Sequence, residues 1–465
     1  MNSMMTRKSF IGAMAVSGLS VGCSSFRLSG GKRWYRGMLH MHSLWSDGHV
    51  TPEQAYAFYK EAGYDFVALT DHNRFQDDPD RWIPVGVGTE KTWPPVTINP
   101  ACYRNYMKRF GETASVRKHN GRTQVRLSTF KEMKKLFEAA GDFLVLPGTE
   151  ITTFAGSGKS QRAVHMNAIG IPAVIERSRK AWLIENLSNH DVASAMRETY
   201  QMTGMLAKEH GVDDFLFILD HPQWPYCDVN ADDMIKAPEV CGFEICNGGA
   251  SYESPTGYDH LKYLNNLWDA ALVHRLNNGQ GVLYGFGSDD THYYPNCGTK
   301  VGLVNDGYIM VKAQDLTERS IMSAIKRGDF YASSQLDLDD VSFDPTSGTL
   351  SVSATPAGSE ESLSIRFITT KKGVSAKPVS YKITGPQKEG DRTPKRRIPL
   401  YDEALGATVK VVKGAKGEYV NASYTLKSDD MYVRAIVESD AHSTFKGRNR
   451  FHPNVKTAWT QPYHL

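Results

Sequence analysis

Short apolar stretches that end in histidine or acidic residues recur along this chain of 465 residues. Residues 35–39 run into His40-Met-His42, and residues 65–69 run into a segment that ends at His72. Each stretch has the length and composition of a buried strand. In a sheet of parallel strands the carboxyl ends share one edge, where binding and catalytic groups collect. The pattern therefore predicts an α/β protein whose polar side chains meet at one face.

The stretch from His40 to Gly48 contains the densest group of candidate ligands. Residues two apart on an extended segment point the same way, so His40 and His42 are expected to project together. Paired imidazoles suit zinc, iron or manganese. Asp47 adds a carboxylate in a Ser-Asp-Gly turn. We expect a metal site here, against the alternative of two unrelated histidines in a polar loop.

Later strands repeat the arrangement. Residues 143–147 lead to a carboxylate, residues 163–170 carry a histidine, and residues 215–219 and 282–286 end in further ligand types. The candidate side chains contributed by these strands are Glu150, His165, His221, Asp290 and His292. Helical patterns lie between several strands, at residues 52–62, 129–140, 192–209, 260–278 and 316–327. Strands alternating with helices indicate βαβ units.

Two segments depart from this alternation. Residues 74–128 show no clear periodicity and are expected to form an irregular lid or substrate wall. Arg74 at its start and Asn247 at a strand end are candidate substrate-binding residues. From residue 337 to residue 465 the pattern changes to short strands of period two, which predicts a small all-β, sandwich-like accessory domain.

Composition limits the partners. The net charge is only +3, and no lysine or arginine run is interleaved with aromatics, so no nucleic-acid polymer is expected as a partner.

Residues 1–25 begin with basic residues, continue with an apolar run and reach Cys23, which predicts an export signal, with lipidation at Cys23 as a variant. The expected location is periplasmic or anchored to a bacterial membrane by lipid, and the alternative is an amphipathic helix of a cytosolic protein. The oligomeric state is left open.

The chain has six cysteines and no Cys-x-x-Cys pair. If Cys23 is processed, an odd number remains. We therefore expect neither a cysteine zinc site nor a disulfide framework.

The ordered motifs resemble those of the polymerase and histidinol phosphatase (PHP) superfamily of metal-dependent phosphoesterases. They are His40-Met-His42 with Ser46-Asp47-Gly48, Thr70-Asp71-His72-Asn73, Gly148-Thr-Glu150, His165, His221-Pro222 and Asp290-Thr-His292. The resemblance implies a distorted (β/α)7 barrel over residues 30–336. It also implies two or three divalent ions of zinc, manganese or iron held by His40, His42, Asp47, His72, Glu150, His165, His221, Asp290 and His292.

In such a site clustered ions acidify a water molecule and clamp phosphoryl oxygens. Glu150, Asp290 and His292 are then the candidate catalytic residues, and a small phosphorylated molecule is the expected substrate. Asp47 stands where some members of the family have histidine, which leaves the metal preference open. Two alternatives are an amidohydrolase-like enzyme acting on a non-phosphate bond and a binding or adhesion protein in which the metals are structural.

Overall fold

The computed structural model describes residues 31–86, 97–156, 161–175, 191–224, 227, 229–249, 260–295, 297, 305–384, 396–442 and 455–465. The expected export signal, with Cys23, lies outside these residues. Among the helices that the structure describes, none is both long and apolar enough to cross a membrane.

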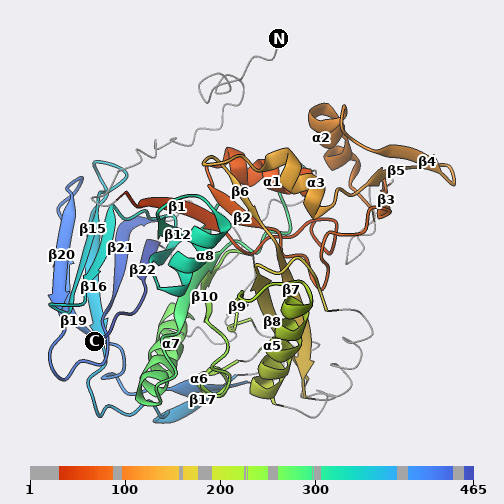
Figure 1. Cartoon of the computed structure of the whole chain (residues 1–465). Helices are drawn as coiled ribbons and strands as arrows, with labels where there is room; N and C mark the ends of the chain where they lie inside the picture. The colour runs from red at the N-terminus through yellow and green to blue at the C-terminus, as the bar shows by residue number, and fades with distance from the viewer. Residues whose placement is uncertain are drawn as a thin grey trace.

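Two large sheets form the framework (Figure 1). The strands of the N-terminal two thirds are β1 (Arg33–Met38), β2 (Phe66–Ala68), β6 (Leu144–Leu146), β7 (Gly148–Ala155), β8 (Arg162–Ile169), β9 (Leu216–Leu219), β10 (Gly242–Asn247), β11 (Tyr284–Ser288), β12 (Gly307–Ala313) and β13 (Phe330–Ser334). Four later strands are β16 (Leu363–Thr369), β19 (Ala407–Lys413), β21 (Arg434–His442) and β22 (Val455–Thr460). The nine-stranded sheet has the order β19-β16-β21-β22-β13-β12-β1-β2-β6, and the five-stranded sheet has the order β11-β10-β9-β8-β7.

The α/β class is confirmed, but a closed (β/α)7 barrel is not. The strands β1, β2 and β6 are parallel, and so are β9, β10 and β11. β7 pairs antiparallel with β8, and β8 pairs antiparallel with β9. Residues 156–161 between β7 and β8 are too few for the crossover that a parallel pair needs. In the described part of the chain the two large sheets consequently do not join into one ring of hydrogen-bonded strands.

The helices begin where the sequence carries capping signals. Helix α1 (Pro52–Glu61) starts with a capping box between Thr51 and Gln54 and stops before Gly63, whose φ of 86° is left-handed. Helix α3 (Phe130–Phe137) has a second capping box between Thr129 and Glu132. The pattern predicts a helix that runs to residue 140, but α3 ends at Phe137. The remaining long helices, α5 (Val192–Glu209), α7 (His260–Asn277) and α8 (Glu318–Lys326), follow the predicted ranges closely.

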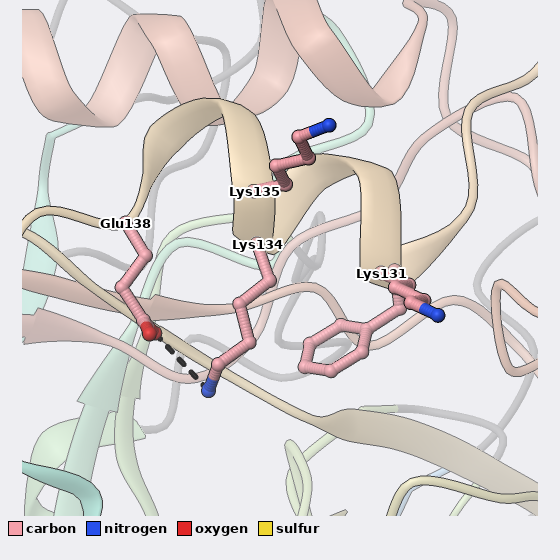
Figure 2. A pocket seen from close by; sticks show the side chains of 5 residues that line it. Lys131, Lys134, Lys135 and Glu138 are labelled. Carbon is pink, nitrogen blue, oxygen red and sulfur yellow. Dashed lines mark ion pairs between the residues drawn. The ribbon is translucent and has the colours of Figure 1, made fainter.

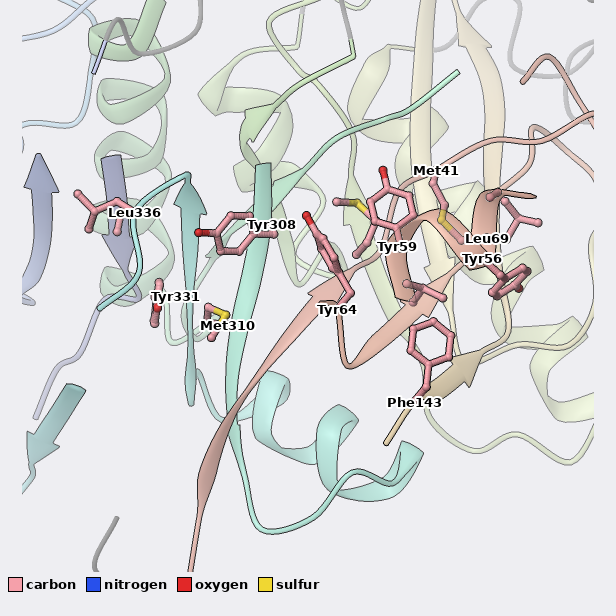
Figure 3. Close-up of a cluster of buried hydrophobic side chains, with 14 of the residues drawn as sticks. Met41, Tyr56, Tyr59, Tyr64, Leu69, Phe143, Tyr308, Met310, Tyr331 and Leu336 are labelled. Carbon is pink, nitrogen blue, oxygen red and sulfur yellow. The ribbon is translucent and has the colours of Figure 1, made fainter. Parts of the chain in front are cut away.

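Aromatic side chains fill the core beside β1 and α1 (Figure 3). Tyr56, Tyr59, Tyr64 and Phe143 are all buried there. A buried phenol needs a hydrogen-bond partner. The Tyr59 hydroxyl donates to Asp289 Oδ2 over 2.9 Å, so the core reaches directly to the loop after β11.

The expectation that residues 74–128 are irregular is wrong for much of the segment. Its described part contains helix α2 (Pro100–Phe110) and a small sheet of β3 (Trp82–Pro84), β5 (Arg122–Arg126) and β4 (Val116–His119), which project from the body (Figure 1). Two signals were present in the sequence. Asn99-Pro100 caps the helix, and Asn120-Gly121, both with positive φ, form the hairpin turn.

The C-terminal third is made of strands, as the period-two pattern indicates. A sheet of β14 (Asp340–Asp344), β15 (Thr349–Ala354) and β20 (Val420–Thr425) packs near β16, where Phe367 stacks on Tyr424. β17 (Ser380–Thr384) and β18 (Arg396–Leu400) form a separate two-stranded sheet, from which Ile398 packs into the hydrophobic core. β22 pairs with β13, so the large sheet runs across the expected domain boundary near residue 337.

Candidate metal centre

The segments that follow β1, β2 and β11 interlock through their backbones. Asp290 N donates to the carbonyl of His40, and His42 N donates to that of Thr291, each over 3.0 Å. His72 forms a parallel bridge with Glu150 in β7. These contacts bring histidine and carboxylate side chains from both sheets to one place, as the strand-end pattern predicts.

Glu150 lies at the middle of the group and is fully buried. Its Oε2 is 3.1 Å from His40 Nε2, 3.2 Å from His42 Nε2 and 3.1 Å from His72 Nδ1. Its Oε1 is 2.7 Å from His165 Nδ1. One carboxylate therefore faces four histidines from three segments of the chain and could hold cations together with them.

A second part of the centre surrounds Asp47. Its Oδ1 lies 3.4 Å from His42 Nδ1 and 3.2 Å from His292 Nε2, and its Oδ2 lies 3.4 Å from His72 Nε2. The rings of His42 and His292 stack with centroids 4.1 Å apart. Asp47 thus faces three histidines and can bind a cation together with them.

Every residue expected to bind metal takes part in a group of donors close enough for one ion. Each group has donor atoms within 4.8 Å of one another. The groups are His42, Asp47, His72 and His292; His40, His42 and Asp290; His40, Glu150 and His221; and His72, Glu150 and His165.

The donor set fits divalent cations in its ligand types and in its hydrogen bonding. Imidazole and carboxylate are the ligands that zinc, manganese and iron share. Glu150 Oε1 and His165 Nδ1 lack hydrogen-bond geometry with each other and are buried without another hydrogen-bond partner in the described residues. Such atoms cost free energy unless something binds them. An ion between them would remove that cost.

The charges point the same way. Burial opposes the charged form of His42, but hydrogen bonds to Asp290 and Glu150 outweigh it and raise its pKa to about 10. Burial also opposes the charge of Glu150, yet the imidazoles of His72, His40 and His165 hold the pKa of that carboxyl well below its usual range. The carboxyl of Glu150 is thus held in its charged form by positive charge beside it, which metal ions could supply in exchange for imidazole protons.

Asp71 holds the loop that carries the first ligands. Its carboxylate accepts hydrogen bonds from the backbone N–H and the hydroxyl of both Ser43 and Ser46, at 2.7–3.1 Å. The motif acid after β2 therefore acts through the backbone of the β1 loop rather than as a ligand.

Two of the expected ligands have unusual backbone conformations. His221 and Asp290 have φ of 25° and 50°, in the left-handed region that residues with a Cβ rarely adopt. Strained residues of this kind cluster at functional sites, where the surrounding structure maintains them. Their placement at the centre agrees with that expectation.

Sequence reasoning missed Asp220 and Glu244, which complete a further donor group with His40. Asp220 directly precedes a ligand, and Glu244 is the acidic residue inside the apolar strand β10. An acid in a strand that is buried along its whole length was the signal that could have identified Glu244.

Of the two expected substrate-binding residues, only one lies at the centre. Asn247 is buried at the centre, where its Nδ2 donates to Glu244 Oε2 over 2.7 Å and lies 3.3 Å from Asp290 Oδ2. Arg74 is exposed, and no contact of its guanidinium with the centre is found among the described residues. The structure therefore brings Asn247 to the site, but as a partner of carboxylates, and does not bring Arg74 there.

A separate surface hollow of about 480 Å³ lies on helix α3 (Figure 2). It is lined by Phe130 and by charged side chains, including Lys134, which pairs with Glu138 over 3.1 Å. None of its lining residues belongs to the donor groups. It is not the metal centre.

Cys102 in α2 forms a disulfide with Cys297, in the loop that follows the last ligands. The sequence predicts no disulfide framework, and the described cysteines form this one disulfide while Cys227, Cys241 and Cys246 remain unoxidised. Because 195 positions separate them, only the fold reveals that they are neighbours.

No protein-family model matches the chain, and no curated protein is significantly similar to it. Solved structures are similar. One is a two-domain protein from Bacteroides vulgatus containing a predicted PHP-like metal-dependent phosphoesterase, with 15% identity and a TM-score of 0.36 over 94% of this chain and 96% of that one.

Two more structures match a smaller part. A candidate metal-dependent phosphoesterase from Bifidobacterium adolescentis has 14% identity and a TM-score of 0.26, over 58% of this chain and 91% of that one. An amidohydrolase from Chromobacterium violaceum, with bound sulfate and no metal, has 13% identity and a TM-score of 0.25, over 58% and 92%.

Proposed function

We propose that this protein is a metal-dependent phosphoesterase that hydrolyses a small phosphorylated molecule. The observation that carries the proposal is the arrangement around Glu150, whose two oxygens face four histidines while Oε1 lacks a hydrogen-bond partner in the described residues. Clustered divalent ions, when bound, supply a water of low pKa and positive charge for the phosphoryl oxygens.

The side chains then have distinct tasks. Glu150 and Asp290 would help to hold the ions, and Asp290 Oδ1 lies 3.0 Å from His42 Nε2. His292 Nδ1 donates to the carbonyl of Asp290 over 2.9 Å. That contact keeps a proton on Nδ1 and places the lone pair of the neutral ring on Nε2, the atom that faces Asp47 and could bind an ion.

The open side of the centre is the edge formed by His72 and His292. Their side chains are 23% and 17% exposed, whereas that of Glu150 is fully buried. A substrate reaches the ligands from this edge, which lies beside the start of the inserted segment.

The test combines metal removal with substitution. We expect chelation to abolish hydrolysis of aryl phosphomonoesters or diesters, and Mn²⁺ or Zn²⁺ to restore it. His40→Ala should lower kcat by several orders of magnitude, because it removes a ligand of the ions. His119→Ala, on the exposed strand β4, is the matched control.

Activity that survives both the chelator and His40→Ala would exclude this mechanism. Hydrolysis of amides or lactones in place of phosphoesters would favour the amidohydrolase-like alternative. Tight metal binding without hydrolysis of phosphoesters, amides or lactones would favour a metal centre with a structural role only.

We further propose that His165 and His221 help Glu150 to hold a third ion. His165 Nδ1 and His221 Nε2 lie 2.7 Å and 3.7 Å from Glu150 Oε1. The double variant His165→Ala, His221→Ala should therefore lose about one equivalent of metal while remaining folded. Two equivalents in the wild type at saturating metal would show that no third site exists.

Export remains a proposal as well. The basic and apolar N-terminus supports it, and so does the disulfide between Cys102 and Cys297, because such bonds persist in oxidising compartments. Fractionation should find the mature protein outside the cytosol, and lipid labelling should disappear in Cys23→Ala. An intact N-terminus on soluble cytosolic protein would refute export.

A further inference from the structure

We propose that Glu244 in β10 is a positioning residue that sets the orientation of the ligands His40, His221 and Asp290. The inference rests on the proposed metal centre and names a residue outside its ligand set. Glu244 is 1% exposed and lies at a strand that contributes no metal ligand of its own. Its contacts nevertheless reach ligands from three other segments.

All acceptor positions of Glu244 are occupied by protein donors. Oε1 receives hydrogen bonds from His40 Nδ1, at 2.7 Å, and from the hydroxyl of Ser288. Oε2 receives them from the backbone N–H of His221, at 2.8 Å, and from Asn247 Nδ2, at 2.7 Å. A carboxylate has about four lone-pair positions. None remains for an ion, so Glu244 acts on the centre through other residues.

The bond to His40 selects one tautomer of its ring. With Nδ1–H donating to Glu244, the lone pair of the ring is on Nε2. That atom faces the centre, 3.1 Å from Glu150 Oε2 and 3.3 Å from Asp290 Oδ1. Glu244 therefore presents His40 in the form that binds a metal, and the negative charge of the carboxylate makes Nε2 more basic.

The hydrogen bonds at Glu244 Oε2 act on the other two ligands, His221 and Asp290. The N–H of His221 belongs to a residue with a left-handed φ of 25°, and its bond to Glu244 helps to maintain that strained backbone. Asn247 Nδ2 lies between Glu244 Oε2 and Asp290 Oδ2, at 2.7 Å and 3.3 Å. One buried carboxylate thus couples the loops after β1, β9 and β11.

The experiment measures metal affinity without substrate. Co²⁺ titration, followed by its visible absorption, should show that Glu244→Gln binds about 10–100-fold more weakly than the wild type while the number of ions at saturation is unchanged. Glutamine keeps the size of the side chain but turns one acceptor oxygen into a donor group. That group then faces protein donors. The Co²⁺ absorption band should also shift, because His40 is reoriented.

Glu361→Gln is the matched control. Glu361 is also buried, at 7% exposure, and accepts from the hydroxyl of Ser439 and from Lys456 Nζ, in the C-terminal third. Its substitution should lower the melting temperature without changing Co²⁺ affinity. If Glu244→Gln does not fold, Asn247→Ala should give a smaller fall in affinity of the same kind, because it removes one donor while Glu244 and His40 remain.

The outcomes separate the two proposals. Wild-type affinity in the folded Glu244→Gln variant would overturn the positioning role alone. Loss of a whole equivalent of Co²⁺ at saturation would also overturn it, by showing that Glu244 is a ligand. A wild-type protein that binds no Co²⁺ would overturn the proposed metal centre and this inference with it.

Discussion

At the scale of the single residue, Gly48 shows how tightly the first ligand loop is folded. A Cβ at this position would lie 2.5 Å from the backbone carbon of His42, closer than real contacts allow. Gly48 N also donates to the carbonyl of Ser43 over 2.9 Å. The Ser-Asp-Gly turn therefore needs glycine for close approach, so that Asp47 can face His42.

Gly48→Ala should destabilise the protein by about 1–3 kcal/mol, because the backbone of the loop must move. The affinity for metal should fall as well, because the movement of the loop would separate His42 from Asp47. Gly204→Ala in α5 is the control. Its Cβ would meet only Phe215, at 4.0 Å, so the change should be neutral or stabilising in thermal unfolding. Equal melting temperatures and metal affinities for Gly48→Ala and wild type would contradict the close approach.

At the scale of elements, the disulfide joins the inserted segment to the metal centre. Cys102 lies in α2, and Cys297 follows the loop of Asp290 and His292. Tyr294, in the same loop, donates to the carbonyl of His42 over 3.1 Å. The inserted helix is thus covalently tied to a loop that also contacts the first ligand strand.

The double variant Cys102→Ala, Cys297→Ala should lose about 2–5 kcal/mol of unfolding free energy, because the bond closes a long loop. Limited proteolysis should then cut within residues 97–128 faster than in the wild type. Reductant should reproduce the effect in the wild type but leave the double variant unchanged. Cys241→Ala, which removes a free thiol, is the control. Insensitivity of the wild type to reductant would argue against a stabilising bond.

At the scale of the molecule, buried hydrogen bonds join the C-terminal strands to the part of the chain that carries the candidate metal centre. Arg434 in β21 forms two hydrogen bonds with Asp269 in α7, at 2.9 Å and 2.7 Å, and both are buried. The side chain of Gln461 pairs with the backbone N–H and carbonyl of Gly285 in β11. A strand that leads to Asp290 therefore depends on contacts from the last residues of the chain.

Asp269→Asn should cost about 3–5 kcal/mol in chemical denaturation, because the buried guanidinium of Arg434 loses its counter-charge. Glu360→Gln breaks the exposed pair with Lys416 and should cost less than about 1 kcal/mol. A small and equal effect of the two substitutions would mean that the buried pair of Asp269 and Arg434 does not stabilise the contact between α7 and the C-terminal strands.

Local chemistry in the sequence was sufficient to locate the side chains that could bind metal and most of the helices. Apart from His165, which lies within β8, the expected metal ligands lie in segments that follow a strand, and strand ends can be located from apolar runs followed by polar residues. Helices α1 and α3 begin at capping boxes that are visible in the sequence. These features depend on neighbours along the chain, so no knowledge of distant contacts was needed to find them.

Contacts between distant segments decided the rest. The antiparallel pairing of β7 with β8, which replaces a closed barrel, depends on hydrogen bonds that no local pattern specifies. The pairing of Cys102 with Cys297 and the role of Glu244 depend on which segments meet, and Arg74 is exposed because its loop turns its side chain outward. The sequence by itself determined which groups could bind metal, because that is a matter of residue type and strand position. Only the tertiary structure decided which residues hold them in place, because orientation is set by atoms far apart along the chain.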